Sequence, residues 1–220
     1  FFDATCPLVT KVHMEVRKHA KASKDIILVG HEGHPEVEGT MGRHINSDNS
    51  SIYLVQNELD AKNIKINNPT KLALVTQTTL SVDETKSIID ILKYRFPDID
   101  IPKKDDICYA TQNRQDAVKQ LALESDFMIV VGSKNSSNSN RLSELAEKCG
   151  CRSILIDEFT DIDLDDLKNY SKISITAGAS APESKVMEIA KSLELHTDAE
   201  IIEHGEDNED IYFKLPPGLR

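Results

Sequence analysis

Short apolar runs separated by polar loops and helical segments recur along the chain. Ile26–Val29, Leu72–Val75 and Met128–Val131 are continuous apolar runs, and each is followed by a polar loop and then by a helical pattern. A continuous apolar run, rather than an alternating one, is typical of a strand that is buried on both faces of a parallel sheet. The pattern therefore predicts an α/β fold in which helices cover both faces of parallel sheets.

Helix start signals follow the run at 72–75 and a further strand-like segment, ISITA (173–177). Ser81 stands three residues before Glu84, and Ser180 stands three residues before Glu183. This spacing is typical of a capping box, in which the serine hydroxyl accepts a hydrogen bond from the backbone of the later residue. Pro182 would then fall in the first turn of the second of these helices, where proline is favoured.

A proline-bracketed stretch, FPDIDIPKKDDIC, separates the chain into two sets of strand–helix units. We place one module at residues 1–104, another at 105–192, and a C-terminal tail at 193–220. The segments Asp3-Ala-Thr-Cys6 and Asp105-Asp-Ile-Cys108 share an aspartate three residues before a cysteine, and each precedes a helical segment. Two similar α/β modules, each presenting one cysteine just before a helix, are the economical interpretation.

Composition narrows the classes of function. The chain has 37 acidic against 26 basic residues and a net charge of −11. This excess repels phosphate backbones, and no Lys/Arg cluster interleaved with aromatics offsets it, so nucleic-acid binding is disfavoured. No apolar run approaches the roughly 18–20 residues of a membrane span. Four cysteines are too few for a disulfide scaffold, which favours reduced thiols with metal or catalytic chemistry.

The loops after the strands carry small hydrogen-bonding residues. Ligands of doubly wound sheets bind beyond the carboxyl ends of the strands. Those positions hold GHEGHPE (30–36), TQTT (76–79), SKNSSN (133–138) and AGAS (177–180). Hydroxyls, amides and the N–H groups of helix N-termini together suit an oxyanion such as phosphate. Neither a Walker A sequence nor G-x-G-x-x-G occurs, so a nucleotide site is not indicated.

These loop features also have plainer structural interpretations. Ser81 and Ser180 are favoured helix caps, and a run of serines and asparagines is typical of a solvated loop. His31 and His34 do not make a metal site by themselves. Glu36 is either a surface acid or a proton donor held beside a ligand.

The four cysteines fall into two groups. Cys149 and Cys151 stand at the end of a helix and the start of a strand, which is typical of packing. Cys6 and Cys108 each precede a helix, whose dipole favours the thiolate, the form that ligates iron.

Six stretches together resemble the 4-hydroxy-3-methylbut-2-enyl diphosphate reductase family (IspH/LytB). They are DATCPLVTKVH, GHEGHPEVEGTMG, VTQTTLSVD, DDICYATQNRQ, VVGSKNSSNSNRL and TAGASAPE, in the order of the family. The resemblance implies three α/β modules in a pseudo-threefold arrangement around a [4Fe–4S] cluster, each supplying one cysteine. Residues 1–104 and 105–192 correspond to the second and third modules. The first module, with the third cysteine, is expected to be missing, and the tail to pack on that module or on its neighbour.

The resemblance also implies an activity and roles for individual residues. The reaction is a two-electron reductive dehydroxylation of (E)-4-hydroxy-3-methylbut-2-enyl diphosphate to isopentenyl and dimethylallyl diphosphate, in the non-mevalonate isoprenoid pathway. Cys6 and Cys108 resemble cluster ligands, and Glu36 resembles the proton source. The residues that resemble the substrate pocket are His34, Thr78, Ser136, Ser137, Asn138 and Ser180. The implied electron donor is of the ferredoxin or flavodoxin type, and the implied location is a bacterial cytoplasm or else a plastid-type organelle.

Two other functions stay open. A non-catalytic α/β module could bind a phosphorylated ligand without redox chemistry, and a genuine chain start just before Phe1 would favour it. A zinc protein could use Cys6, Cys108 and a histidine, but the spacing fits no compact zinc motif.

Overall fold

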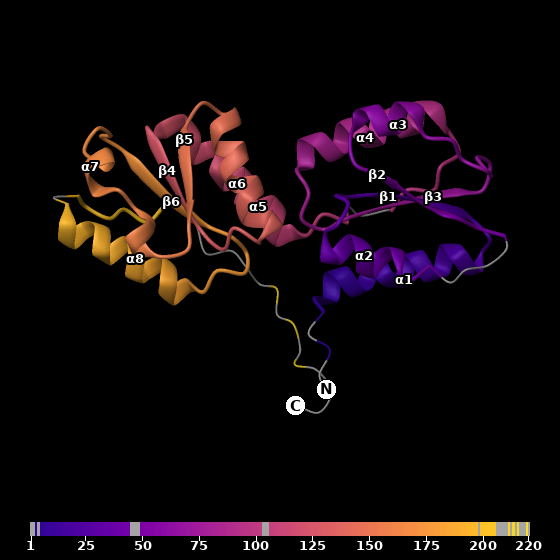
Figure 1. Cartoon of the computed structure of the whole chain (residues 1–220), viewed down its shortest axis with the longest axis horizontal. Coiled ribbons are helices and arrows are strands. Elements are labelled where there is room, and N and C mark those ends of the chain that lie inside the picture. The colour runs from indigo at the N-terminus through magenta and orange to yellow at the C-terminus, as the bar shows by residue number, and fades with distance from the viewer. Residues whose placement is uncertain are drawn as a thin grey trace. The chain divides into compact units, whose positions relative to one another are not determined.

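The computed structural model describes residues 3, 5–44, 49–102, 106–197, 199–205, 211, 213, 215 and 219. The chain divides into two compact units between Cys108 and Tyr109 (Figure 1). The module boundary expected from the sequence, between residues 104 and 105, lies outside the described residues. Within the described part of the chain, no helix is long and apolar enough to cross a membrane.

The first unit contains a three-stranded parallel sheet in the order β2–β1–β3. The central strand β1 (Asp25–Val29) pairs with β2 (Ile52–Val55) on one side and with β3 (Leu72–Thr76) on the other. Every residue of β1 and β3 is buried. The continuous apolar runs of the sequence therefore correspond to strands that are covered on both faces.

Helices cover the two faces of this sheet, with α1 (Pro7–Lys21) and α2 (Pro35–Met41) on one face (Figure 1). The other face carries α3 (Glu58–Asn63) and α4 (Val82–Arg95). Alternate β1 residues point to opposite faces: one core contains Ile27 together with residues of α3 and α4, and the other contains Ile26 together with residues of α1 and α2. Burial of each such side chain contributes about 1.5–3 kcal/mol.

The second unit repeats the plan with a parallel sheet in the order β5–β4–β6. Its strands are β4 (Phe127–Val131), β5 (Arg152–Ile156) and β6 (Ile173–Ala177). The α/β class and the two parallel-sheet modules predicted from the sequence are thereby confirmed.

The helices of the second unit again lie on both faces of its sheet (Figure 1). One apolar core involves α5 (Tyr109–Glu124) and α6 (Ser137–Lys148). The other involves α7 (Leu164–Leu167), α8 (Glu183–His196) and the 3₁₀ turn Phe159–Asp161. Since α8 continues to His196, four residues of the segment expected to be tail belong to this helix.

The two helix starts predicted from capping boxes differ in outcome. Ser81 is the N-cap of α4, and its hydroxyl accepts a hydrogen bond of 3.4 Å from the backbone N–H of Glu84. The expectation for Ser180 was wrong: the N-cap of α8 is Pro182, with φ −64° and ψ 136°. A residue that precedes proline is biased away from helical geometry, so the helix does not extend upstream through Ala181. Ser180 is consequently exposed in the loop before α8.

Candidate functional site

The carboxyl ends of β1 and β3 bring Glu36 and Thr78 together. Glu36 lies in the first turn of α2, directly after the N-cap His34, whose Nδ1 accepts a hydrogen bond of 3.1 Å from the Glu36 N–H. The Glu36 carboxylate accepts two hydrogen bonds from Thr78, 2.7 Å from its backbone N–H and 3.2 Å from its hydroxyl. Residues 42 positions apart thus form one hydrogen-bonded group, as parallel topology predicts.

Burial controls the protonation of this group. It raises the pKa of Glu36 above its ordinary value, and the negative charge of Asp106 raises it further, although the two hydrogen bonds from Thr78 act in the opposite direction. Burial lowers the pKa of His34. Glu36 therefore keeps its proton to higher pH than an ordinary glutamate, and the neutral His34 ring holds the backbone next to it.

Gln77 is a part of this site that the sequence analysis missed. Its side chain is 1% exposed; Oε1 accepts from the His31 N–H at 3.1 Å, and Nε2 donates to the Thr79 hydroxyl at 3.0 Å. The first of these bonds joins the loop after β1 to the loop after β3, and the second lies within the loop after β3. Its position in TQTT, between a buried strand and a helix cap, was the signal that could have identified it.

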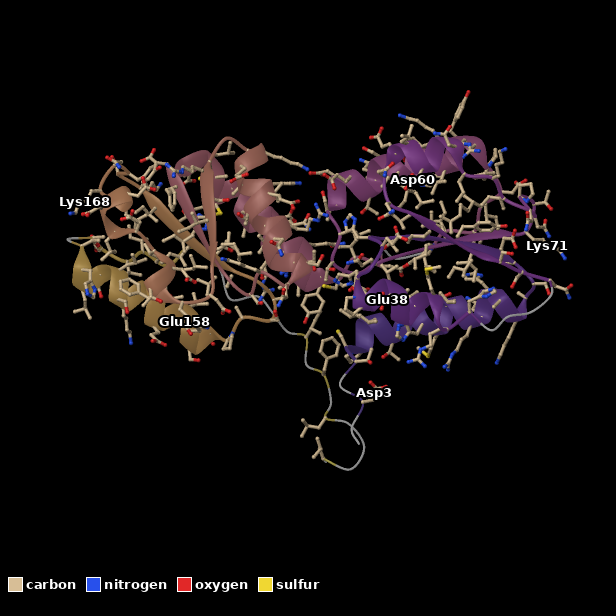
Figure 2. All side chains as sticks on the ribbon, viewed as in Figure 1. Asp3, Glu38, Asp60, Lys71, Glu158 and Lys168 are labelled. Atoms are coloured by element: carbon tan, nitrogen blue, oxygen red, sulfur yellow. The ribbon has the colours of Figure 1, made fainter. Side chains whose placement is uncertain are left out.

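The two cysteines at helix starts both lie in the first unit. Cys6 is exposed and is the N-cap of α1, and Pro7 follows it at the first helical position. Cys108 is half-buried directly before α5, and its backbone N–H donates to the Thr78 carbonyl at 3.0 Å. Asp3, labelled in Figure 2, accepts a hydrogen bond of 3.0 Å from the Thr5 N–H ahead of Cys6. Asp105, its counterpart in the sequence echo, lies outside the described residues.

Two thiols that stand directly before helices are of the kind that ligates an iron–sulfur cluster. All four cysteines lie within the described residues and are thiols rather than disulfides. In the same part of the chain, no group of three or more His, Cys, Asp or Glu side chains is placed to hold a metal ion. Cys6 and Cys108 are thus suitable as two ligands of a larger set.

The second unit carries the neutral donors expected to bind an anion. Ser136 is the N-cap of α6, and its hydroxyl accepts from the Ser139 N–H at 3.3 Å. Ser137 is half-buried and Ser180 is exposed. Asn138 is 4% exposed, and neither its Oδ1 nor its Nδ2 has a hydrogen-bond partner among the described residues. A buried amide without partners costs free energy, so this side chain is suited to bind a ligand that reaches it.

Ser139 is a second residue that the sequence analysis missed. It is fully buried, and its hydroxyl has no partner in the described part of the chain. Gly132 follows β4 and Gly178 follows β6; a Cβ atom built at either would lie 2.3 Å or 2.1 Å from the Ser139 hydroxyl oxygen. Glycine at both strand ends therefore lets the first turn of α6 approach the sheet edge. The glycines in VVGSK and TAGAS were the available signal.

Cys149 and Cys151 occupy positions typical of packing. Cys149 is the half-buried C-cap of α6, and Cys151 is 2% exposed within the apolar core that includes α5 and α6. Burial raises the pKa of the Cys151 thiol, which disfavours its thiolate.

Comparison with known proteins places this geometry in context. A family model described as LytB protein matches residues 1–194. A protein named 4-hydroxy-3-methylbut-2-enyl diphosphate reductase from Saccharophagus degradans is 55% identical over 219 residues, covering 100% of this chain and 70% of its own length. One with the same name from Pseudomonas putida strain F1 is 56% identical over 221 residues, with the same two coverages.

Solved structures give a matching result. The E-1-hydroxy-2-methyl-but-2-enyl-4-diphosphate reductase of Plasmodium falciparum aligns with a TM-score of 0.81 at 39% identity, covering 87% of this chain and 59% of that chain. A structure named (E)-4-hydroxy-3-methyl-but-2-enyl diphosphate reductase aligns at 0.53 and 28% identity, covering 88% and 67%. The chain thus spans between 59% and 70% of the length of these relatives.

Proposed function

The chain belongs to the LytB protein family, whose relatives are named as diphosphate reductases, and from this premise we propose that it takes part in reductive dehydroxylation. The substrate is (E)-4-hydroxy-3-methylbut-2-enyl diphosphate, and the products are isopentenyl and dimethylallyl diphosphate. The allylic alcohol takes up two electrons and two protons, its C–O bond breaks, and water leaves. The observation that supports this most directly is the half-buried Glu36 carboxyl, hydrogen-bonded to Thr78, whose carbonyl accepts the N–H of Cys108.

Cys6 and Cys108 are the proposed ligands from this chain. When bound, a [4Fe–4S] cluster would supply the electrons for the reduction. Cys6 at the N-cap of α1 and Cys108 directly before α5 would each hold it through their sulfur atoms.

Glu36 is the proposed acid. Hydroxide is a poor leaving group, so cleavage of the C–O bond needs a proton on the departing oxygen. The raised pKa of Glu36 keeps a proton available on its carboxyl. Thr78 holds that carboxyl through its N–H and hydroxyl, and His34 holds the backbone N–H of the acid.

The diphosphate is proposed to bind to the neutral donors Ser136, Ser137, Asn138 and Ser180. The buried amide of Asn138, which lacks partners among the described residues, supports this assignment. Fixed hydroxyls and amides bind an oxyanion without the reorganisation that flexible lysines require.

The proposal extends to the reductant and the location. A ferredoxin or flavodoxin-type carrier would deliver the electrons one at a time, and a bacterial cytoplasm is the compartment in which such carriers and reduced thiols occur together.

Anaerobic reconstitution with iron and sulfide tests the proposal. We expect the chain, joined to the part of the Saccharophagus degradans relative that it does not match, to take up both, to bind inorganic diphosphate, and to form the two C5 diphosphates with a dithionite–methyl viologen reductant. The Saccharophagus degradans relative, treated in parallel, is the positive reference. Diphosphate binding without uptake of iron by this joined protein would contradict the reductase and favour a non-catalytic module that binds phosphorylated ligands. The Asn138 amide, which has no partner in the described part of the chain, supports that second candidate equally, since it does not depend on the thiols.

A further inference from the structure

An ion pair of the first unit joins the two segments that carry Cys6 and Cys108. The Nζ atom of Lys11 lies 3.1 Å from Oδ1 of Asp106. Lys11 is in α1, five residues after Cys6, and Asp106 stands two residues before Cys108. The side chain of Asp106 is 0% exposed and that of Lys11 is 39% exposed, so the pair is formed around a fully buried carboxylate.

Further hydrogen bonds attach the Asp106 segment to the end of β3. The second carboxylate oxygen of Asp106 accepts a hydrogen bond of 3.1 Å from the Thr76 N–H. Two residues later, the Cys108 N–H donates to the Thr78 carbonyl at 3.0 Å. The segment 106–108 is therefore bonded to the strand end at two points and to α1 at a third.

We propose that Lys11 and Asp106, the Lys11–Asp106 clip, are positioning residues that fix the separation of the Cys6 and Cys108 thiols before a cluster is bound. The cysteines stand at the beginnings of two helices, α1 and α5, 102 positions apart in the sequence. The clip therefore links α1 to the Cys108 segment directly, in addition to the link that the sheet provides. The inference that this separation serves a cluster rests on the proposed function.

An ion pair at this place fixes the direction in which the two side chains meet. Removing a carboxylate from water costs several kcal/mol, which apolar packing of the same volume would avoid. What an ion pair adds is a defined geometry: two oxygens with two donors from two elements, Lys11 of α1 and Thr76 of β3. Such a contact fixes how α1 lies on the sheet edge, whereas apolar contacts allow it to slide.

Spin labels on the two thiols test the clip without any cluster. In a Cys149→Ser, Cys151→Ala background, nitroxides on Cys6 and Cys108 give a distribution of distances by dipolar electron paramagnetic resonance. We expect a narrow distribution in the parent and one about twofold wider in both Asp106→Asn and Lys11→Met, because a buried pair loses its geometry when either partner is removed. The double variant should be no wider than either single one, since coupled residues are not additive.

A matched control removes another ion pair of the same unit. Lys24 and Asp100 lie 2.7 Å apart, and both are partly exposed. Asp100→Asn should leave the distribution unchanged, and Lys11→Arg, which keeps the charge, should restore a narrow one. If Asp106→Asn fails to fold, as judged by circular dichroism, Lys11→Met alone decides the question, because its side chain is partly exposed and its loss leaves the Thr76 bond in place.

The outcomes separate the clip from the proposed function. Equal widths in the parent and in folded clip variants would overturn the clip. Wider distributions together with iron and sulfide uptake by the parent, and about tenfold faster release of iron to a chelator from the variants, would support both. Wider distributions with no uptake by the parent, even when it is joined to the unmatched part of the relative, would keep the clip and reject the cluster. Uptake and release identical in parent and variants would show that the clip does not serve the cluster.

Discussion

The two units share one plan but use it for different chemistry. Each has a parallel sheet with its first strand in the centre and helices on both faces. At the strand ends of the first unit, each carboxyl group has hydrogen-bond donors: Thr78 for Glu36, and Lys11 for Asp106. At those of the second unit, the buried groups are neutral, and Asn138 and Ser139 have atoms without partners among the described residues.

This difference indicates where a ligand is needed to complete each site. The first unit satisfies its carboxylates internally, and its unpartnered buried atoms among the described residues are single ones, the Thr76 hydroxyl and Nε2 of His13, rather than a whole amide. The second unit carries an unsatisfied amide, so ligand binding would recover free energy that folding leaves unused. We therefore expect substitutions in the first unit to change catalysis and those in the second to change affinity for diphosphate.

The largest effect is expected from Glu36→Gln. Removing a general acid typically costs 10²–10⁴-fold, so turnover of the allylic diphosphate should fall about 100-fold or more. Affinity for inorganic diphosphate should not change, because that site is assigned to the second unit. The measurements are product formation and isothermal titration.

The control for this substitution is Glu38→Gln. Glu38, labelled in Figure 2, is exposed in the same first turn of α2. The Glu38→Gln substitution should change neither the turnover nor the affinity for inorganic diphosphate. A Glu36→Gln protein that keeps its turnover, or that loses its affinity for diphosphate, would contradict the assignment of catalysis to the first unit and of diphosphate binding to the second.

Asn138→Leu should separate stability from binding. Leucine has nearly the shape of asparagine and no polar atoms, so it removes two unsatisfied buried groups. The free energy of unfolding without ligand should rise by about 1–3 kcal/mol, while diphosphate affinity falls about 10–100-fold. Urea unfolding and titration calorimetry measure the two changes.

Thr78→Val in the first unit should have the opposite effect on stability to Asn138→Leu. It removes a hydroxyl that donates to Glu36, so the unfolding free energy should fall by about 0.5–1.5 kcal/mol. If Asn138→Leu destabilised the chain as Thr78→Val does, the amide would have partners after all, and the comparison would not hold.

Gly178→Ala should affect only the second unit. The added Cβ would lie 2.1 Å from the Ser139 hydroxyl oxygen, and such overpacking costs about 1–3 kcal/mol. A second substitution, Ser139→Gly, should recover part of that loss by removing the clashing atoms. The measurement is urea unfolding, and retention of full stability by Gly178→Ala alone would refute the close approach of α6.

The matched control lies in the first unit. A Cβ at Gly39 would meet its nearest neighbour, Nε2 of His13, at 3.7 Å, which is ordinary van der Waals contact. Gly39→Ala should therefore be tolerated, or should even stabilise α2, since alanine is the better helix former.

Features that depend on residues close together in the sequence could be predicted, and features that depend on contacts between distant residues could not. The strands and the α4 cap depend on local pattern, and the runs at 26–29, 72–75 and 128–131 predicted strands within a residue of their ends. The loops that hold Glu36 and Thr78 also followed, because parallel strands place their carboxyl ends at one edge.

Other parts depend on contacts that no local pattern encodes. Lys11 and Asp106 are 95 residues apart, and nothing in either neighbourhood distinguishes them from surface charges. Ser139 required the knowledge that two strand-end glycines face one helix turn. For Ser180 the capping signal was present, but the restriction imposed by Pro182 on the preceding residue prevailed.

The smallest predicted effect concerns pH and the Glu36 carboxyl. Because its pKa is raised in the folded chain above the ordinary value of 4.5, the folded state holds the proton more tightly than the unfolded state. This contribution to stability is complete below about pH 4.5 and is lost as pH rises through the folded pKa. The loss should amount to about 1.4 kcal/mol for each pH unit that separates the two pKa values.

Urea unfolding of the parent and of Glu36→Gln across this pH range isolates the contribution, because other groups titrate alike in both. The parent should become less stable relative to the glutamine variant as pH rises, whereas Asn138→Leu should show a constant difference from the parent, since no charge changes. A difference between parent and Glu36→Gln that stays constant with pH would mean that the Thr78 hydrogen bonds cancel the effect of burial. Glu36 would then carry no more of its proton near neutral pH than a surface glutamate, and its assignment as the acid would lose its physical basis.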